Sequence, residues 1–273
     1  MAVPELPVPT WFAGCGNMGG AIVEGWRGAG IDLSNAVVIR PSGVPVPGIR
    51  TVQKFEDAGL APQMVVLAFK PQKLDEVAPK LSAHVGPAAI VVSMLAGVTA
   101  ATLRTRFPTA KAIVRIMPNL PVAQVQGVIA IYTGDFDHDQ LLEECKPLTW
   151  LGMAPWCDSE EELGVIGAVA AAGVAYVARF AEALGRTAAD LGVNPTRARS
   201  IAVQTLVGTS DLAKATGESM AEIARRVASP KGTTEQGLAV LDAPDGLQPL
   251  VDRTLAAAIR RGKELAEEAG RHN

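Results

Sequence analysis

The stretch "TWFAGCGNMGGAIVEGW", residues 10–26, decides the fold of the amino-terminal half of the chain. Its apolar start, residues 11–13, predicts a short buried strand, and its end through Trp26 has the apolar spacing of a helix. Between them, Gly14-Cys15-Gly16-Asn17-Met18-Gly19 fits the pattern G-x-G-x-x-G. A helix that begins at such a turn presents free N–H groups and the positive end of its dipole. The stretch predicts a cradle for a pyrophosphate, although glycine-rich turns also serve ordinary packing.

Length and composition predict a globular protein. The chain has 273 residues, 48% of them hydrophobic and 19% charged, which is enough for one large or two ordinary domains with real cores. A net charge of −3 gives no basic field for nucleic acid, so we expect no nucleic-acid partner. The first ten residues lack the charged and apolar regions of a signal peptide, and the three cysteines lack metal-ligand spacing. We therefore expect a cytoplasmic protein without a metal site.

An uncharged segment, "LGVIGAVAAAGVAYVA" at residues 163–178, raises the question of a membrane. Its 16 residues fall short of the roughly 20 that a spanning helix needs. Ser159 followed by Glu162 is a capping-box pattern at the start of a helix. We therefore predict a buried helix, in the protein core or at a subunit interface, and no membrane partner.

The pattern of apolar runs changes near residue 155. Before it, short apolar runs at 37–39, 64–69, 89–95, 113–117 and 127–132 alternate with helical stretches. This alternation is typical of a parallel sheet covered by helices. After it, residues 160–271 read as successive helices separated by Gly and Pro breaks. We predict an α/β Rossmann domain over residues 1–155 and an all-helical domain over 156–273.

The end of the second predicted strand bears on which dinucleotide binds. An NAD-binding Rossmann domain usually carries an acid there for the ribose 2′-OH. This chain instead has Arg40, with Ser42 close behind. Because an arginine can bind a 2′-phosphate, the sequence favours NADP, with NADPH preferred over NADH. The alternative is a solvated surface arginine.

The sequence offers few groups for chemistry. Its three histidines, His84, His138 and His272, lie in no motif, and no metal-ligand cluster or Ser-His-Asp pattern is visible. The reaction must therefore need little from the protein. Reduction of a C=N bond fits, because a protonated imine accepts hydride without a strong general acid.

Five ordered segments carry a family resemblance: "GCGNMGGAI" at 14, "LAFKPQ" at 67, "VSMLAGVT" at 92, "RIMPNLP" at 115 and "VASPKGTTEQGLAVL" at 227. Together they resemble the pyrroline-5-carboxylate reductases over nearly the whole chain. The resemblance implies a Rossmann domain followed by a helical dimerisation domain, and NADPH-dependent reduction of the cyclic imine 1-pyrroline-5-carboxylate to L-proline. It also implies a homodimer, or a higher assembly of dimers, whose active site lies between the cofactor and the dimer interface.

The resemblance assigns roles residue by residue. The pyrophosphate is expected at Gly14, Gly16, Asn17, Met18 and Gly19, the 2′-phosphate near Arg40 and Ser42, and the rest of the cofactor along Ala68, Lys70, Pro71, Met117, Pro118 and Asn119. The substrate carboxylate is expected at Ser229, Gly232, Thr233 and Thr234, with Thr234 as the proton donor or orienter at the ring nitrogen. Without the resemblance, these segments read equally as a strand end, a turn and a break between helices.

The chain departs from the family in several places. Ala172-Gly173-Val174-Ala175-Tyr176 lacks the serine and proline of the usual Ser-Gly-Pro-Ala-Tyr run, and we expect a more regular helix there. Leu120 stands where threonine is common, and Lys231 replaces a frequent glycine. Two alternatives stay open. One is a non-catalytic NADP-binding paralogue that acts as a redox sensor or structural partner. The other is a related NADP-dependent imine or β-hydroxyacid oxidoreductase. β-Hydroxyacid dehydrogenases use a catalytic lysine on the interdomain helix, and residues 160–178 contain no lysine.

Overall fold

The computed structural model describes residues 3–135, 139 and 141–271, and it divides into two compact units. The first unit is Met1–Ala172 with Ala258–Asn273, and the second is Gly173–Ala257. Each is described by itself. The start of the long apolar helix and the end of the last helix thus belong with the sheet, whereas the predicted domains divide at residue 155. The two divisions rest on different criteria, and the domain boundary stays a prediction.

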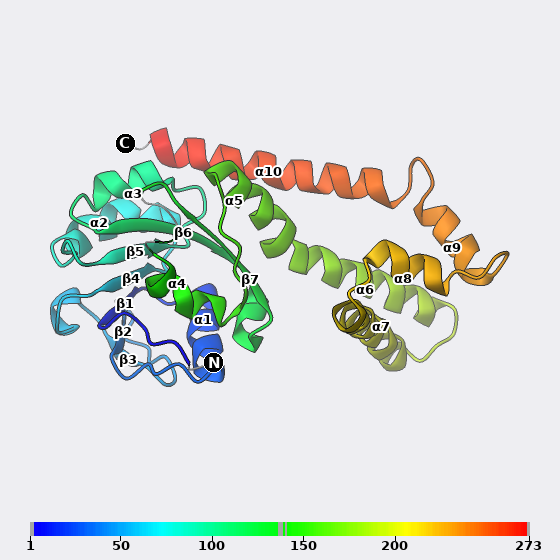
Figure 1. Cartoon of the computed structure of the whole chain (residues 1–273), viewed down its shortest axis with the longest axis horizontal. Coiled ribbons are helices and arrows are strands. Elements are labelled where there is room, and N and C mark those ends of the chain that lie inside the picture. Colours follow the sequence, from blue (N-terminus) through cyan, green and yellow to red (C-terminus); the bar gives the residue numbers. More distant parts are fainter. Residues whose placement is uncertain (1–2, 136–138, 140, 272–273) are drawn as a thin grey trace. The chain divides into compact units, whose positions relative to one another are not determined.

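The first unit is an α/β sandwich, and its sheet confirms the predicted fold class (Figure 1). The strands are β1 (Thr10–Ala13), β2 (Ala36–Ile39), β3 (Arg50–Val52), β4 (Met64–Leu67), β5 (Ile90–Ser93), β6 (Ala112–Pro118), β7 (Gly127–Thr133) and β8 (Gly152–Met153). The helices are α1 (Asn17–Gly28), α2 (Leu74–Ser82), α3 (Ala100–Arg106), α4 (Leu142–Thr149) and α5 (Glu160–Ile166), with short 3₁₀ turns at Phe55–Asp57, Pro71–Lys73 and Leu120–Gln124.

The strand order is β3-β2-β1-β4-β5-β6-β7-β8. Every neighbouring pair is parallel except β6 and β7, which form an antiparallel pair with Ile116 opposite Ile131. The predicted sheet is therefore confirmed as mostly parallel, and its order reverses between β1 and β4. In open α/β sheets, ligands bind at the carboxyl ends of the strands at such a switch point.

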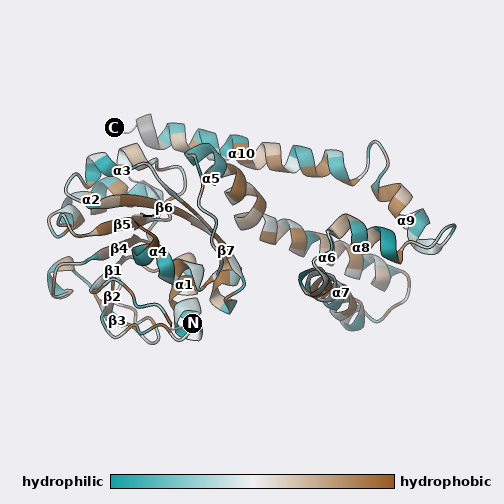
Figure 2. Ribbon diagram, in the orientation of Figure 1, coloured by the Kyte–Doolittle hydropathy of each residue, from teal (hydrophilic) through white to brown (hydrophobic). Residues whose placement is uncertain are grey.

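Strands β1, β2, β4 and β5 are buried on both faces, and alternate residues point to opposite sides. Phe12, Val38, Val66 and Val92 pack with α1 and α4, whereas their neighbours, such as Trp11 and Val65, pack with α2 and α3. Figure 2 shows the central strands in brown, the colour of hydrophobic residues. Strands this short are stable because helices cover both faces of the sheet.

The glycines of the opening stretch serve close packing as well as the loop. Gly14 has φ +79°, and a Cβ there would lie 2.9 Å from the carbonyl oxygen of Ala68. On α1, a Cβ on Gly19 would lie 3.0 Å from the Cβ of Ala68, and one on Gly25 would lie 2.1 Å from the carbonyl oxygen of Val122. Glycine therefore lets α1 approach both β4 and the 3₁₀ turn after β6.

The apolar segment at 163–178 begins as predicted but continues differently. The Ser159 hydroxyl accepts a hydrogen bond from the Glu162 N–H (3.1 Å). A π-helical turn occupies Gly167–Ala171, just before the stretch 172–176 for which a more regular helix was expected, and regular helix begins with α6 (Gly173–Asp190). In the π-helical turn, the Ala172 N–H donates to the carbonyl of Gly167, five residues back. The irregular turn therefore lies before Gly173, and whether the missing proline makes the following helix more regular than in the family stays a prediction.

The second unit consists of helices: α6, then α7 (Pro195–Thr216), α8 (Met220–Val227), α9 (Thr233–Leu241) and the start of α10 (Leu247–Arg271). Burial in a core is wrong for most of the apolar helix, because large side chains on it stay exposed within the chain: Val169 (55%), Val177 (55%) and Phe180 (40%). By length and composition, residues 160–190 could cross a membrane. A subunit interface is the other destination that the sequence left open.

Candidate active site

The glycine loop has the geometry of an anion cradle. Gly16 is the N-cap of α1 and supplies no side-chain cap, and the first turn of the helix contains no acidic residue. The first intrahelical bond runs from the Gly20 N–H to the Gly16 carbonyl, which leaves the N–H groups of Asn17, Met18 and Gly19 without intrahelical acceptors. A Cβ added at Gly16 would meet open space. The loop therefore fits a pyrophosphate.

Arg40 and Ser42 lie beside this loop, in a turn that follows β2. The Arg40 Nε donates to the Ser42 hydroxyl (2.9 Å), and its Nη1 donates to the carbonyl of Cys15 (3.3 Å). Of the five N–H donors of a guanidinium, three remain for a ligand. Within the described part of the chain, no carboxylate pairs with Arg40. The arrangement holds a cation against the glycine loop, as the sequence predicted for a 2′-phosphate.

A cavity of about 330 Å³ continues the cradle at the carboxyl ends of β1 and β2. Its walls include Gly14, Pro41, Phe55 and Val77, with Lys54 among its polar residues. An apolar slot beside a phosphate cradle suits the adenosine part of a dinucleotide. Of these residues, sequence reasoning predicted Gly14. It missed Lys54 and Phe55 because β3 is only three residues long, so nothing indicated that the segment after it reaches this edge.

Of the cofactor residues predicted after β4, Ala68 is part of the buried framework and Lys70 lies on the surface. Ala68 is buried, donates its N–H to the Ala13 carbonyl (2.9 Å) and packs against the position of Gly19. Lys70 is exposed and is the N-cap of the 3₁₀ turn that Pro71 begins. Ala68 therefore positions the cradle, while Lys70 and Pro71 lie at the same carboxyl edge with Lys70 free to meet a ligand.

The residues predicted after β6 are part of the framework. Met117 packs against Gly167, where a Cβ would lie 2.8 Å from its Cγ, and Pro118 ends the strand. Asn119 is buried (6% exposed), its Oδ1 accepts from the Val128 N–H (2.8 Å), and its Nδ2 donates to the Ala170 carbonyl (3.1 Å). The amide of Asn119 thus joins the β6–β7 hairpin to the π-helical turn. Because the Asn119 amide is already hydrogen-bonded, a nicotinamide would have to contact other atoms of residues 117–119.

An ion pair between a buried arginine and a half-buried glutamate, which sequence reasoning did not assign, holds the start of α5. The Arg115 Nη1 donates to Glu160 Oε1 (2.7 Å), and the same oxygen accepts from the Ala100 N–H at the start of α3 (2.7 Å). Beside this pair, a cavity of about 570 Å³ is lined by Gly97, Met117 and Ala172, among others. Ala172 therefore lines a cavity at the position where the family pattern has a serine.

The loop between α8 and α9 contains the predicted substrate residues, in the second unit. Gly232 is the N-cap of α9 and has no side-chain cap, and Thr233 and Thr234 occupy the exposed first turn. The Ser229 hydroxyl lies against Gly232, because a Cβ there would come within 2.4 Å of its Oγ. Free N–H groups, the helix dipole and three hydroxyls make this terminus suitable for a carboxylate.

Lys231 shows why glycine is frequent at its position in the family pattern. Its φ is +59°, in the left-handed region that glycine adopts without strain. Its N–H donates to Glu235 Oε2 (2.7 Å), which holds the turn closed. The predicted cofactor residues lie in the first unit and the substrate loop lies in the second, so they form two separate groups.

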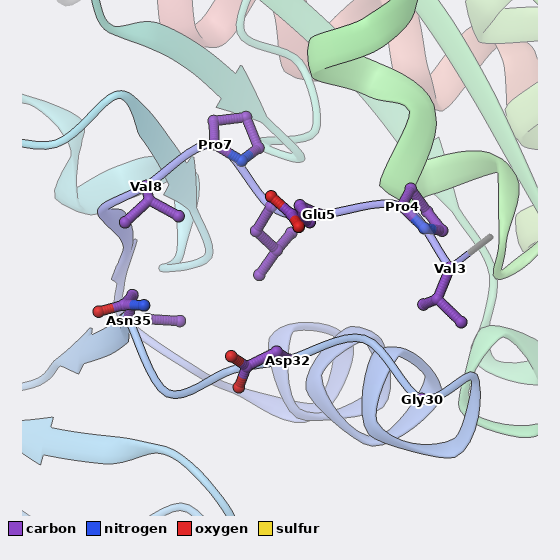
Figure 3. Close-up of a pocket in the computed structure, with 10 residues that line it drawn as sticks. Val3, Pro4, Glu5, Pro7, Val8, Gly30, Asp32 and Asn35 are labelled. Carbon is purple, nitrogen blue, oxygen red and sulfur yellow. The ribbon is translucent and has the colours of Figure 1, made fainter.

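Other features of the first unit do not fit a catalytic role. Burial raises the pKa of Cys145 to about 12 and that of Cys157 to about 11, so both thiols stay protonated at neutral pH. The described residues contain no cluster of three metal-ligating side chains, and His138 and His272 lie outside them. The pocket in Figure 3, around Glu5, Asp32 and Asn35, lies at the amino ends of β1 and β2, the edge opposite the one that ligands use.

Known protein families and curated relatives match this chain over almost its full length. Residues 160–265 match the family described as "Pyrroline-5-carboxylate reductase dimerisation". Residues 11–97 match the family described as "NADP oxidoreductase coenzyme F420-dependent". The pyrroline-5-carboxylate reductase of Pseudomonas aeruginosa is 30% identical over 99% of this chain and 100% of its own length. The chain belongs to the pyrroline-5-carboxylate reductase family. The Danio rerio pyrroline-5-carboxylate reductase 3 is 32% identical over 94% of this chain and 91% of its own.

Solved reductase structures share the fold. The Coxiella burnetii pyrroline-5-carboxylate reductase has a TM-score of 0.86 and 30% identity, covering 95% of this chain and 99% of that one. The Plasmodium falciparum pyrroline carboxylate reductase, solved with NADP bound, has a TM-score of 0.83 and 20% identity, covering 96% and 99%. The reductase family thus includes both compact units of this chain.

Proposed function

We propose that the protein reduces 1-pyrroline-5-carboxylate to L-proline with NADPH, preferring NADPH to NADH, and that it acts as a cytoplasmic homodimer. The observation that carries this proposal is the relation to the reductases over the full length of the chain, through both the sheet unit and the helical unit. The local geometry supports it in two places: the anion cradle beside Arg40 and the helix terminus beside Ser229.

When bound, NADPH supplies the hydride that reduces the C=N carbon. The residues that fit it are those of the glycine loop, whose first-turn N–H groups lack acceptors and whose Gly14 leaves no room for a Cβ. Arg40 supports the preference for NADPH, because its side chain is held by Ser42 and Cys15 rather than neutralised by an acid.

The loop before α9 supplies the substrate contacts in this proposal. Its N–H groups and hydroxyls hold the carboxylate, Lys231 adds positive charge, and the Thr234 hydroxyl orients or donates a proton to the ring nitrogen. A single neutral donor suffices because the imine is basic enough to arrive protonated.

Exposed apolar helices support the homodimer. Val177 and Phe180 on α6, with Ile201 and Val207 on α7, are between 40% and 55% exposed within one chain. Contiguous apolar surface of this kind marks an interface. Three unpaired cysteines support the cytoplasmic location, which the distribution of a tagged protein between cell fractions tests.

Turnover of 1-pyrroline-5-carboxylate with NADPH tests the activity, and Thr234→Ala tests the assignment. We expect the variant to lower kcat by about ten- to a hundredfold and to change KM less, since the hydroxyl acts as charge moves at the nitrogen. Thr254→Ala is the control, because that hydroxyl bonds to the Leu250 carbonyl of its own helix (2.8 Å). A wild-type protein that binds NADPH without turnover would favour the non-catalytic alternative, and recovery of turnover in Ala172→Ser with Val174→Pro would locate the loss.

A further inference from the structure

The neighbouring parallel strands β2 and β3 end at the same level of the sheet. Ile39 of β2 pairs with Val52 of β3 as the last pair, and the Arg40 N–H then donates to the Val52 carbonyl (2.9 Å). The residues that follow, Arg40 and Pro41 on one side and Gln53 and Lys54 on the other, therefore emerge next to each other.

A tight turn fixes the spacing between these two segments. The Gly43 N–H donates to the Arg40 carbonyl (3.0 Å), and Gly43 has φ +62°. A Cβ on Gly43 would lie 2.5 Å from Nε2 of Gln53, so the Gln53 side chain rests on the turn that carries Ser42. The segment after β3 is thus packed against the segment that bears the predicted phosphate residues.

Lys54, the next residue, faces the ligand side. It lines the 330 Å³ cavity together with Gly14 and Pro41. The described chain gives its ammonium no carboxylate partner within ion-pair distance. Two acids also line the cavity, but Glu76 is paired with Lys73 (2.6 Å), which leaves Glu56 as the one described lining carboxylate without an ion pair.

We propose that Lys54 is a second cation for the 2′-phosphate of NADP, placed by β3 opposite Arg40 from β2. This inference rests on the proposed NADPH-dependent function and names a specificity residue within it. Arg40 is held rigidly by two hydrogen bonds, whereas Lys54 is exposed and reaches the phosphate as a mobile point charge. Its contribution is therefore smaller than that of Arg40 and more sensitive to salt.

Nucleotide titration by fluorescence tests the assignment in the full-length protein. We expect Lys54→Met to weaken NADPH binding by about three- to tenfold and NADH binding by less than about twofold, because only NADPH carries the 2′-phosphate. Lys54→Arg should keep the preference, and raising the salt concentration should reduce the difference between wild type and Lys54→Met. Lys146→Met is the control, since Lys146 is an exposed lysine on α4 that does not line the cavity, and we expect less than a twofold change.

The outcomes separate the inference from the proposed function. Equal losses of NADPH and NADH in Lys54→Met, or an equal effect of Lys146→Met, would overturn the role of Lys54 while leaving NADPH binding intact. A wild-type protein that binds neither nucleotide would instead overturn the proposed function. Thermal unfolding of each variant without nucleotide guards against a folding defect, and an unchanged Tm is expected for an exposed side chain.

Discussion

Asn119 tests whether a residue that was predicted to bind the cofactor instead stabilises the fold. Replacing it with alanine removes two hydrogen bonds, from the Val128 N–H at 2.8 Å and to the Ala170 carbonyl at 3.1 Å. Each part-buried group left without a partner costs about 1–2 kcal/mol, so we expect Asn119→Ala to lower the free energy of unfolding by about 2–4 kcal/mol. The affinity for NADPH should change less than about threefold, because the amide is already engaged within the framework.

The four tryptophans make this measurement specific, because Trp11, Trp26, Trp150 and Trp156 all lie in the first unit. Urea unfolding followed by tryptophan fluorescence therefore reports the stability of the sheet unit. Asn35→Ala is the control, since the Asn35 amide is exposed and reaches only the Ser34 hydroxyl at 3.4 Å, and we expect a change within about 0.5 kcal/mol. Unchanged unfolding with a tenfold loss of NADPH affinity would refute the framework role.

Asn119→Asp adds a dependence on pH whose sign follows from the same contacts. The carboxylate can still accept from the Val128 N–H, but it places a negative oxygen against the Ala170 carbonyl. The folded-state pKa of this carboxyl should therefore rise above the value of about 3.9 in the unfolded chain. Because a raised carboxyl pKa favours the protonated folded form, the stability deficit should be smallest near pH 4 and grow as pH rises.

Three further predictions concern the cofactor, the assembly and the substrate loop. Wild-type protein should bind NADPH at least about tenfold (1.4 kcal/mol) more tightly than NADH, and Arg40→Asp should abolish the preference; equal wild-type affinities would contradict the assignment. Light scattering at micromolar concentration should show a dimer, Phe180→Asp should weaken it, and a stable wild-type monomer would disprove the interface. Lys231→Gly should raise the free energy of unfolding of the helical unit, measured by circular dichroism, by about 0.5–1 kcal/mol, since Lys231 has φ +59°. The same variant should raise KM for the imine carboxylate, and an unchanged KM would remove Lys231 from the substrate site.

Local sequence signals predicted the centre of the fold well. Strands β1, β2 and β4–β7 each contain a continuous apolar run, because both faces of each strand are covered by helices. The switch from glycine loop to helix was equally readable, since Gly14 and Gly19 leave no room for a Cβ while Gly16 leaves open space beside the helix terminus. In these places, sequence, local conformation and packing require the same residue types.

The predictions failed where a contact from elsewhere in the chain decides the conformation. Strand β3 has an exposed or half-buried face and three residues, so its pairing with β2 left no apolar run to read. The cavity beside Lys54 depends on that pairing, and for this reason the residues around it were missed. The part-buried Arg115–Glu160 pair likewise joins residues 45 positions apart, which no local spacing indicates.

The π-helical turn shows how such a contact overrides composition. Residues 167–171 contain only Gly, Ala and Val, and nothing in that composition favours five-residue hydrogen bonds over the usual four. The carbonyl of Ala170 accepts a hydrogen bond from the Asn119 amide, which lies outside the helix. Gly167 has no side chain, so Met117 packs directly on the helix backbone. The irregular turn is therefore held by residues of "RIMPNLP", a segment whose family role was assigned to the cofactor. A motif can serve the nicotinamide side of a site by shaping the helix behind it, and the unfolding of Asn119→Ala measures that contribution directly.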